Sequence, residues 1–346
     1  MSRISQWFWS EAVWLPANTT WSDVANIPGR KVVYADIKDF LYIIPLGLMV
    51  FLVRYILERY CLTPLGKYLD IEDTRPSKVP HNAKLEAAYL SRKPNFPLLA
   101  KQLDMTERQV AVWWRLRSIQ DKPSRLFKFC ESAWKAIFYI FVTVYGLYIL
   151  WDKDWFWEYS TCFDGYPHQG VTDDVRWYYM FQTANSWCVL IFQFSAVKRK
   201  DALQMYIHHF ATIILASFSW IGNMHRIGTL VFILHDCGDI TLEIGKSLKY
   251  ARYHGMCNCM FVIFVTKWIV TRIIIFPIGI ISITTNYVRT CPLYYLMKAL
   301  LWLLYCLHIV WTWYILQAVY RTLKAGQFEG DVRSSDSEDE ISDHKD

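Results

Sequence analysis

The chain has 346 residues, of which 54% are hydrophobic and 17% aromatic, and it carries a formal net charge of +6. Soluble domains are roughly 45 to 50% apolar, so the excess is concentrated in part of the chain. It lies in long apolar runs rather than in alternating stripes, which indicates membrane spans and excludes an ordinary soluble globular protein.

Seven segments are long and apolar enough to be transmembrane helices, since a hydrocarbon core about 30 Å thick requires about 20 residues of helix. Met1–Trp21 lacks a basic head followed by an apolar core, so no cleavable signal peptide is predicted. We therefore predict an all-α, polytopic membrane protein. Its predicted spans are Phe40–Leu57, Ala133–Trp151, Trp177–Phe194, Met205–Gly222, Ile227–Leu248, Met256–Thr284 and Tyr294–Val319.

The loops between the spans predict their direction, because Lys and Arg concentrate in cytosolic loops. Basic residues follow the first, third, fifth and seventh spans, whereas the loop Asp152–Asp174 holds one Lys against six acidic residues. Residues 1–37 are therefore predicted to be lumenal, residues 38–60 to form the first transmembrane helix, and the C-terminus to be cytosolic. Asn18 begins an Asn-Thr-Thr sequon in the lumenal segment, so we predict that it is glycosylated.

Residues 61–131 are polar and are predicted to form a small helical cytosolic domain. Leu98–Leu103 and Thr106–Arg115 indicate a helix, a turn and a second helix, with Thr106 as the N-cap. This pattern resembles the second and third helices of a homeodomain. Leu116, however, stands where a homeodomain has the Asn that pairs with adenine, and Lys67–Asp70 replaces the basic arm. We therefore expect no DNA binding.

The cysteines show no paired framework, and most of them lie in apolar runs, where a small core residue is expected. Cys162 and Cys291 lie in predicted lumenal segments and could form a disulfide. Cys257 and Cys259 have no second pair of ligands nearby, so no metal site is predicted.

Residues 324–346 form an acidic tail that is predicted to be cytosolic, solvated and disordered. Ser335 and Ser337 each have an acidic residue three positions further on. We therefore predict phosphorylation of both serines by an acid-directed kinase.

The fifth span carries a polar stripe that is unusual in a membrane. Successive helical residues turn by about 100°, so the stripe occupies about one third of the helix circumference. Intramembrane ionisable groups are costly and are functional candidates by default. This span is therefore expected to face a polar cavity. The stripe consists of His235, Asp236, Asp239, Glu243 and Lys246.

The preceding span offers the matching imidazoles, His208 and His209, near its predicted cytosolic end. Because adjacent residues point about 100° apart, one ring is expected to face the cavity and the other to bond to backbone or a neighbouring helix. Imidazole can act as base or nucleophile, and a nearby carboxylate can fix its tautomer, so the set suits acyl transfer. Asp236 and Asp239 could raise one another's proton affinity or hold an incoming ammonium.

Other catalytic patterns fit these residues less well. Met205 stands where a membrane di-iron enzyme would need a further His, and Phe210 stands where a palmitoyl transferase would need a Cys. No Gly-rich phosphate loop or Gly-x-Ser-x-Gly elbow is present. A transporter with a charged path stays an alternative.

The pattern Lys198-Arg199-Lys200-Asp201, His208-His209 and His235-Asp-x-x-Asp239 followed by Glu243 resembles the Lag1 motif of ceramide synthases. Residues 132–323 resemble the six-span TLC catalytic domain of that family, a helix bundle around a cavity. The homeobox-like insert, the sequon and the acidic tail also match its animal form.

This resemblance implies an endoplasmic-reticulum enzyme that joins a fatty acyl chain from acyl-CoA to the amine of sphinganine or another sphingoid base, without a further cofactor. It implies that His208 accepts the acyl group and that His209 supports His208. It also implies that Asp236 and Asp239 orient or deprotonate the reacting groups. His235 opens the motif. The resemblance also allows a homodimer or a heterodimer with related synthases.

Several basic residues have two interpretations. Lys198, Arg199 and Lys200 could dock the phosphates of CoA or could be ordinary cytosolic-loop residues. Lys267 and Arg272 could counter the carboxylates or reach toward an interface, and Arg272 also matches the family pattern. The resemblance further links a lumenal segment, here Thr285–Pro292, to acyl-chain preference.

Two further functions are kept as alternatives. One is a non-enzymatic membrane chaperone or cargo factor of the same fold, which would not need the His pair. The other is a membrane-tethered DNA-binding regulator, which the insert suggests and Leu116 argues against.

Overall fold

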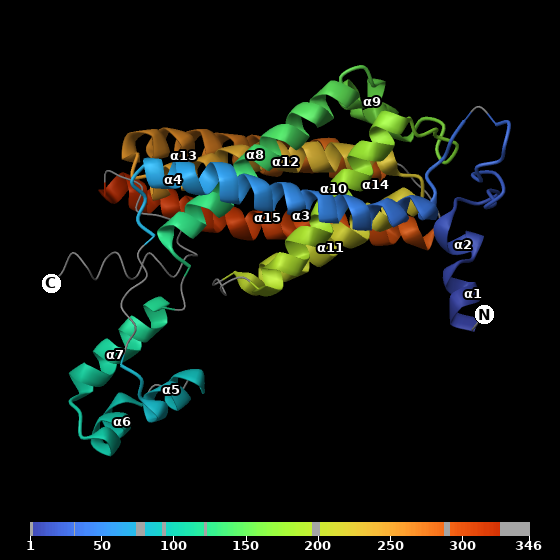
Figure 1. Ribbon diagram of the computed structural model, residues 1–346. Coiled ribbons are helices and arrows are strands. Elements are labelled where there is room, and N and C mark those ends of the chain that lie inside the picture. The colour runs from blue at the N-terminus through green and yellow to red at the C-terminus, as the bar shows by residue number, and fades with distance from the viewer. Residues whose placement is uncertain are drawn as a thin grey trace.

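The computed structural model describes residues 3–30, 32–73, 80–91, 95–120, 123–195, 201–286 and 291–325. Within those ranges the chain forms helices and no β-strand, which confirms the all-α fold (Figure 1). In chain order the helices are α1 (Arg3–Phe8), α2 (Glu11–Trp14), η1 (Ile37–Tyr42), α3 (Ile43–Leu57), η2 (Glu58–Leu62), α4 (Thr63–Tyr68), α5 (Ala83–Leu90), α6 (Phe96–Leu103), α7 (Glu107–Gln120), α8 (Arg125–Leu150), α9 (Asp154–Trp157), η3 (Tyr159–Phe163), α10 (Asp173–Ser195), α11 (Ala202–Ile221), α12 (His225–Tyr250), α13 (His254–Trp268), η4 (Ile269–Ile281), α14 (Ser282–Asn286) and α15 (Pro292–Ala325).

Each predicted span lies, to within one residue at its end, inside one long helical rod of the described chain. That all seven rods cross the membrane stays a prediction. The segments η1 to α4 form one rod, and α13 to α14 form another. Helices α10, α11 and α12 are also long, but they carry more polar side chains, because they line an internal cavity. Four rods are long and apolar enough to cross a membrane by length and composition alone: Ile37–Tyr68, Arg125–Leu150, His254–Thr285 and Pro292–Lys324.

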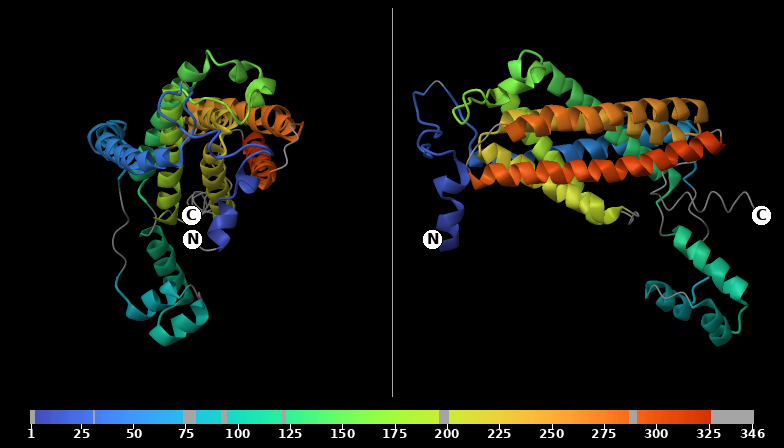
Figure 2. Two further views of the ribbon diagram at one scale, coloured as in Figure 1. Left: turned by 90° about the vertical axis from the view of Figure 1, so that its right-hand side faces the viewer. Right: turned by 180° about the vertical axis from the view of Figure 1, so that it is seen from behind.

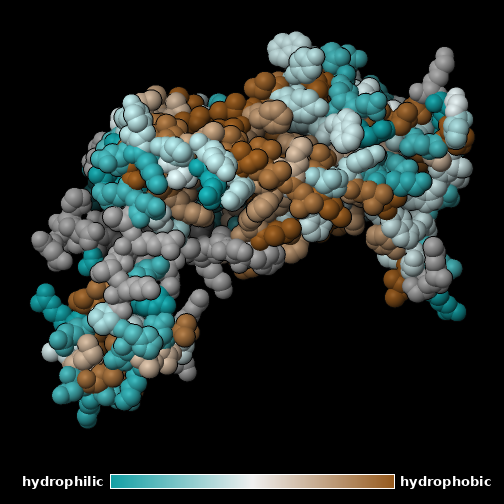
Figure 3. Space-filling view, viewed as in Figure 1, coloured by the Kyte–Doolittle hydropathy of each residue, from teal (hydrophilic) through white to brown (hydrophobic). Residues whose placement is uncertain are grey.

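The outer surface of the bundle is apolar over its middle. Figure 3 shows hydrophobic residues there and hydrophilic residues toward both ends. On α3, Ile44, Leu48 and Leu52 are each more than half exposed. Such a surface would be costly in water, and it fits the hydrocarbon core of a bilayer. The chain is a membrane protein.

Helix α12 lies at the centre of the bundle and contacts α8, α10, α11, α13 and η4 (Figures 1 and 2). Its start is held by a tight turn in which Asn223 has a φ of +55° and donates to the carbonyl of Gln169 at 2.9 Å. Because neighbours surround α12, its polar stripe lies inside the protein.

The N-terminal segment packs against the end of the bundle opposite the insert. Trp14 is 1% exposed and its ring contacts Phe218 of α11 at 5.1 Å. Cys162 and Cys291 belong to the same buried cluster, and the structure forms no disulfide between them. Burial raises the pKa of the Cys162 thiol to about 12.

The insert forms a separate three-helix unit of α5, α6 and α7 with its own core, which includes Leu85, Val110 and Trp113. Thr106 caps α7: its hydroxyl accepts from Gln109 N–H at 3.2 Å, and the Gln109 side chain accepts from Thr106 N–H at 2.8 Å. The predicted helix-turn-helix is therefore confirmed. Leu116 is 38% exposed on α7.

Candidate active site

An internal cavity of about 360 Å³ is lined by most long helices of the described bundle. Cations line the end at which the insert joins the bundle. Each cation is paired with a carboxylate of its own helix: Arg54–Glu58 at 2.8 Å, Lys135–Glu131 at 2.5 Å and Lys246–Glu243 at 2.7 Å. The opposite end is mainly apolar and includes Phe163, Met224, Tyr294 and Met297.

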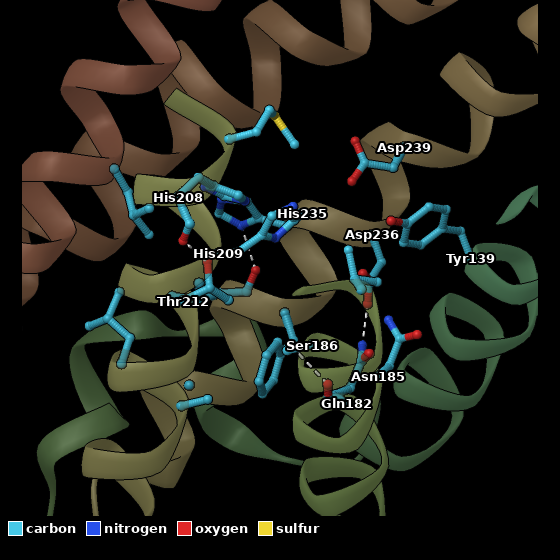
Figure 4. Close-up of a pocket in the computed structure, with 18 of the residues that line it drawn as sticks. Tyr139, Gln182, Asn185, Ser186, His208, His209, Thr212, His235, Asp236 and Asp239 are labelled. Carbon is cyan, nitrogen blue, oxygen red and sulfur yellow. Dashed lines mark hydrogen bonds between the residues drawn. The ribbon is translucent and has the colours of Figure 1, made fainter. Parts of the chain in front are cut away.

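The five stripe residues of α12 all line this cavity, as predicted from their spacing. Asp236 and Glu243 are buried, whereas the Asp239 side chain keeps 28% of its surface exposed. Figure 4 shows Asp236 and Asp239 projecting from α12 on the side that also bears His235.

Helix α11 supplies His208 and His209, whose ring centroids are 5.4 Å apart. The expected hydrogen bond from one ring to the backbone or a neighbouring helix is not formed. Among the residues described, none bonds to a ring nitrogen of either histidine, and His208 Nδ1 and His209 Nε2 are buried without a partner. Both rings line the cavity because they flank one helical stripe that also contains Met205 and Thr212.

His235 differs, because both of its ring nitrogens are engaged. Its Nδ1 lies 2.7 Å from the carbonyl oxygen of Val231, and its Nε2 lies 3.2 Å from His308 Nε2 on α15. Four histidines thus line one cavity: His208, His209, His235 and His308. Among the residues described, His308 Nδ1 is also buried without a partner, so His235 is the one of the four with both ring nitrogens engaged.

Arg272 reaches one carboxylate of the stripe, that of Asp239, whereas Lys267 lies against a backbone carbonyl. Arg272 is 3% exposed, and its Nη2 donates to the His235 carbonyl at 2.8 Å and lies 3.5 Å from Asp239 Oδ1. Lys267 Nζ lies 3.4 Å from the carbonyl of Cys237. Arg272 lies on the π-helical segment η4, a type of helix that often marks functional sites.

Asp236 receives a hydrogen bond from the side-chain amide of Gln182 on α10. The same amide lies 3.3 Å from the hydroxyl of Tyr178. Tyr139 of α8 lines the cavity beside these groups, and Figure 4 shows its hydroxyl pointing toward α12. A buried carboxylate needs such partners to hold one orientation.

Gln182, Tyr139 and His308 were not singled out from the sequence. A usable signal existed for Gln182 and His308, since each is a polar side chain within an apolar predicted span. Their partners lie on other helices and could not be inferred from spacing along the chain.

The remaining predicted residues lie away from this cavity or outside the described ranges. Asn18 is exposed on the N-terminal segment. Lys198, Arg199, Lys200, Ser335 and Ser337 lie outside the described residues, as do residues 287–290 of the segment Thr285–Pro292. Among the residues described, no three His, Cys, Asp or Glu side chains are grouped so that they could hold a metal ion.

The bundle and its polar cavity define a polytopic membrane protein, and the family model of the TLC domain matches residues 128–317. The chain is 38% identical to ceramide synthase 5 from Mus musculus over 95% of this chain and 81% of that protein. It is 37% identical to ceramide synthase 4 from Homo sapiens over 99% of this chain and 89% of that protein. It is 34% identical to ceramide synthase hyl-1 from Caenorhabditis elegans over 96% of this chain and 85% of that protein. The chain belongs to the ceramide synthase family and is an acyltransferase.

Proposed function

We propose that this acyltransferase moves a fatty acyl group from acyl-CoA to the amine of sphinganine or another sphingoid base, forming (dihydro)ceramide. The names of its relatives support these substrates. The observation that carries the mechanism is the state of His208: its ring lines the cavity, and no described residue bonds to either of its nitrogens. An imidazole without partners can use its lone pair for chemistry.

In the first step, a ring nitrogen of His208 attacks the thioester carbonyl. The bond between carbon and sulfur breaks, CoA leaves as the thiolate, and the proton lost by the imidazole neutralises it. The products are an acyl-imidazole and free CoA. His209 lies beside His208 and supports the ring in this step.

In the second step, the amine of the sphingoid base attacks the acyl carbon and the bond to the imidazole breaks. The amine loses one proton, which returns to His208 directly or through Asp236 or Asp239. Both carboxylates line the same cavity, and Asp239 is the more exposed of the two. The amide and the original neutral imidazole are regenerated, so the cycle needs no further cofactor.

The charged end of the cavity suits the CoA moiety. Arg54, Lys135 and Lys246 line it, and their paired carboxylates could be displaced by the phosphates of CoA. Lys198, Arg199 and Lys200 precede α11 and are proposed as additional phosphate contacts. Arg272, deep in the cavity, is proposed to contact the substrate rather than the phosphates.

The orientation is proposed with the charged end and the C-terminus in the cytosol, where acyl-CoA is present, and the N-terminus in the lumen of the endoplasmic reticulum. The loop charges support this direction. We also propose that the protein forms a homodimer or a heterodimer with related synthases. Ser335 and Ser337 are proposed to be phosphorylated.

The decisive test is intact-protein mass spectrometry after incubation with acyl-CoA alone. We expect a mass increase of one acyl chain in the wild type and in His209→Ala, and none in His208→Ala. Absence of an adduct in a wild type that still makes amide would contradict the acyl-imidazole and favour direct attack with histidine as base. Absence of amide from acyl-CoA and sphinganine would contradict the proposed reaction.

A further inference from the structure

His308 of α15 is a buried histidine that the mechanism above does not use. It is 1% exposed, lines the cavity and lies among aromatic rings, with the Phe276 centroid at 5.0 Å and the Trp268 centroid at 6.0 Å. Its one hydrogen-bond partner through a ring nitrogen, among the residues described, is His235, with the two Nε2 atoms 3.2 Å apart. A buried polar side chain within a membrane helix is energetically costly, so it is a candidate for a functional role.

The hydrogen bonds assign the proton positions of both rings. A carbonyl oxygen can only accept, so His235 Nδ1, at 2.7 Å from the Val231 carbonyl, must carry its proton. In neutral His235 the Nε2 atom then has the lone pair and must accept. His308 Nε2 is therefore the donor, and the lone pair of His308 lies on Nδ1.

We propose that His308 is a positioning residue for acyl transfer: its Nε2–H bond to His235 holds the motif helix α12 against α15. This inference rests on the proposed function. A hydrogen bond between side chains of two neighbouring membrane helices stabilises one packing arrangement, so the bond between the rings holds the two helices at one register.

The hydrogen bond between His308 and His235 affects the position of the carboxylates through the backbone of His235. The His235 carbonyl accepts from Arg272 at 2.8 Å, and the same guanidinium nitrogen lies 3.5 Å from Asp239. Asp236 is the next residue along α12. A shift of His235 would therefore move Arg272 and both carboxylates relative to His208, whose ring lies 5.2 Å from Trp311 on the same helix as His308.

The distance between the two nitrogens would also suit two ligands of one metal ion. A structural or catalytic zinc site normally takes three or four protein ligands. The described residues provide no third His, Cys, Asp or Glu at a suitable place. The hydrogen bond accounts for the geometry without an additional group.

The test compares His308→Gln, which keeps an N–H donor near the Nε2 position, with His308→Leu, which keeps bulk but has no donor. We expect kcat to fall by about tenfold in His308→Leu, with KM for acyl-CoA nearly unchanged, and to recover to within about threefold of wild type in His308→Gln. Thr312→Val is the matched control, because it removes a different bond to α15, from Trp268 at 2.9 Å. It should lower thermal stability without this change in kcat.

A second readout does not depend on turnover. Diethyl pyrocarbonate acylates free imidazole nitrogens, and peptide mass spectrometry locates the label. We expect His235 to be protected in the wild type and in His308→Gln, and labelled in His308→Leu. If the wild type made no amide, the proposed function would fail, and this labelling would still decide the role of His308.

Two results would overturn the inference. Equal kcat and equal labelling in His308→Gln and His308→Leu would show that the donor is irrelevant. Loss of wild-type activity on chelation, with recovery on adding Zn²⁺, would show that the two rings bind a metal rather than each other.

Discussion

The carboxylate of Asp236 depends on one neutral side chain. Asp236 is 8% exposed, and the amide of Gln182 is its hydrogen-bond donor on α10. A buried acceptor that loses its donor carries a desolvation cost of about 1 to 3 kcal/mol. The orientation of a proposed catalytic acid is thus set by a residue outside the motif.

Replacement of Gln182 tests this dependence. We expect Gln182→Leu to lower kcat by about tenfold, because the carboxylate can then rotate or take up a proton. The measurement is the rate of amide formation at saturating acyl-CoA and sphinganine. Ser186→Ala is the control, since that hydroxyl donates only to the Gln182 carbonyl at 3.0 Å, and it should stay within about twofold of wild type. Equal losses in both variants would contradict a specific role for Gln182.

At the scale of residues, the sequence predicted which side chains share the cavity but not their hydrogen bonds. His208, His209 and the α12 stripe follow from helical spacing, which is a local property. The engaged state of His235 depends on His308, 73 residues further along the chain. Such long-range partners are set by helix packing and cannot be inferred from local spacing. For the same reason, the expectation that one imidazole of α11 is hydrogen-bonded was wrong.

Helix α10 approaches α12 closely at Gly228. A Cβ placed there would lie 2.7 Å from Cε2 and 2.9 Å from Cζ of Tyr179. Tyr179 is fully buried, and its hydroxyl lies 3.0 Å from the Ala216 carbonyl and also bonds to Ser219. Because the ring is held by these bonds, the absence of a side chain at position 228 permits the contact.

The variant Gly228→Ala should therefore separate α10 from α12. Overpacking of this kind costs about 1 to 3 kcal/mol, so we expect a fall of several degrees in the thermal midpoint measured in detergent. Gly255→Ala is the matched control, because its Cβ would have no neighbour within 4 Å, and it should leave the midpoint unchanged or raise it. An unchanged midpoint in Gly228→Ala would show that the Tyr179 ring is not held in place.

At the scale of elements, the positions of the helical rods could be predicted because length and hydrophobicity are local properties of the sequence. The sequence did not reveal that the span Met256–Thr284 contains the π-helical segment η4 (Ile269–Ile281). Pro277 lacks an N–H, and local rearrangement of the hydrogen bonds around it depends on neighbouring helices. The position of Arg272 against Asp239 depends on the packing of η4 against α12 and was left open at the sequence level.

The orientation of the whole molecule can be tested at Asn18. This residue is exposed on a turn with a φ of +64°. Thr20, the third sequon residue, donates its backbone N–H and hydroxyl to the Asp23 carboxylate, each at 2.8 Å, and these bonds lower the pKa of Asp23. The sequon thus lies in an ordered surface turn.

If the N-terminus is lumenal, the wild type should carry one N-glycan. We expect peptide N-glycosidase to increase its mobility on a gel, and Asn18→Gln to migrate like the treated protein. Thr19→Ala keeps the sequon and should remain glycosylated. A wild type that is insensitive to the glycosidase would argue against the proposed orientation.

The insert is an independent part of the molecule. Its core is made by its own helices, and its two flanks meet where Ser124 donates to Asp73 at 2.8 Å. The bundle is tied together nearby by other residues: Arg125 donates to the Tyr250 carbonyl at 2.8 Å, and Arg252 pairs with Glu72 at 3.1 Å. Since these contacts lie outside residues 80–120, the bundle should not need the insert to fold.

Replacement of residues 80–120 by a short Gly-Ser linker tests this independence. The flanks are already adjacent, so closing the gap with a shorter loop costs little entropy. We expect the thermal midpoint in detergent to change little and the rate of amide formation to stay within about threefold of wild type. The control is Arg125→Ala in the full chain, which removes a contact of the bundle itself and should lower the midpoint. A linker variant that loses activity while keeping its midpoint would show that the insert acts on the cavity, and one that fails to fold would show that the bundle depends on it.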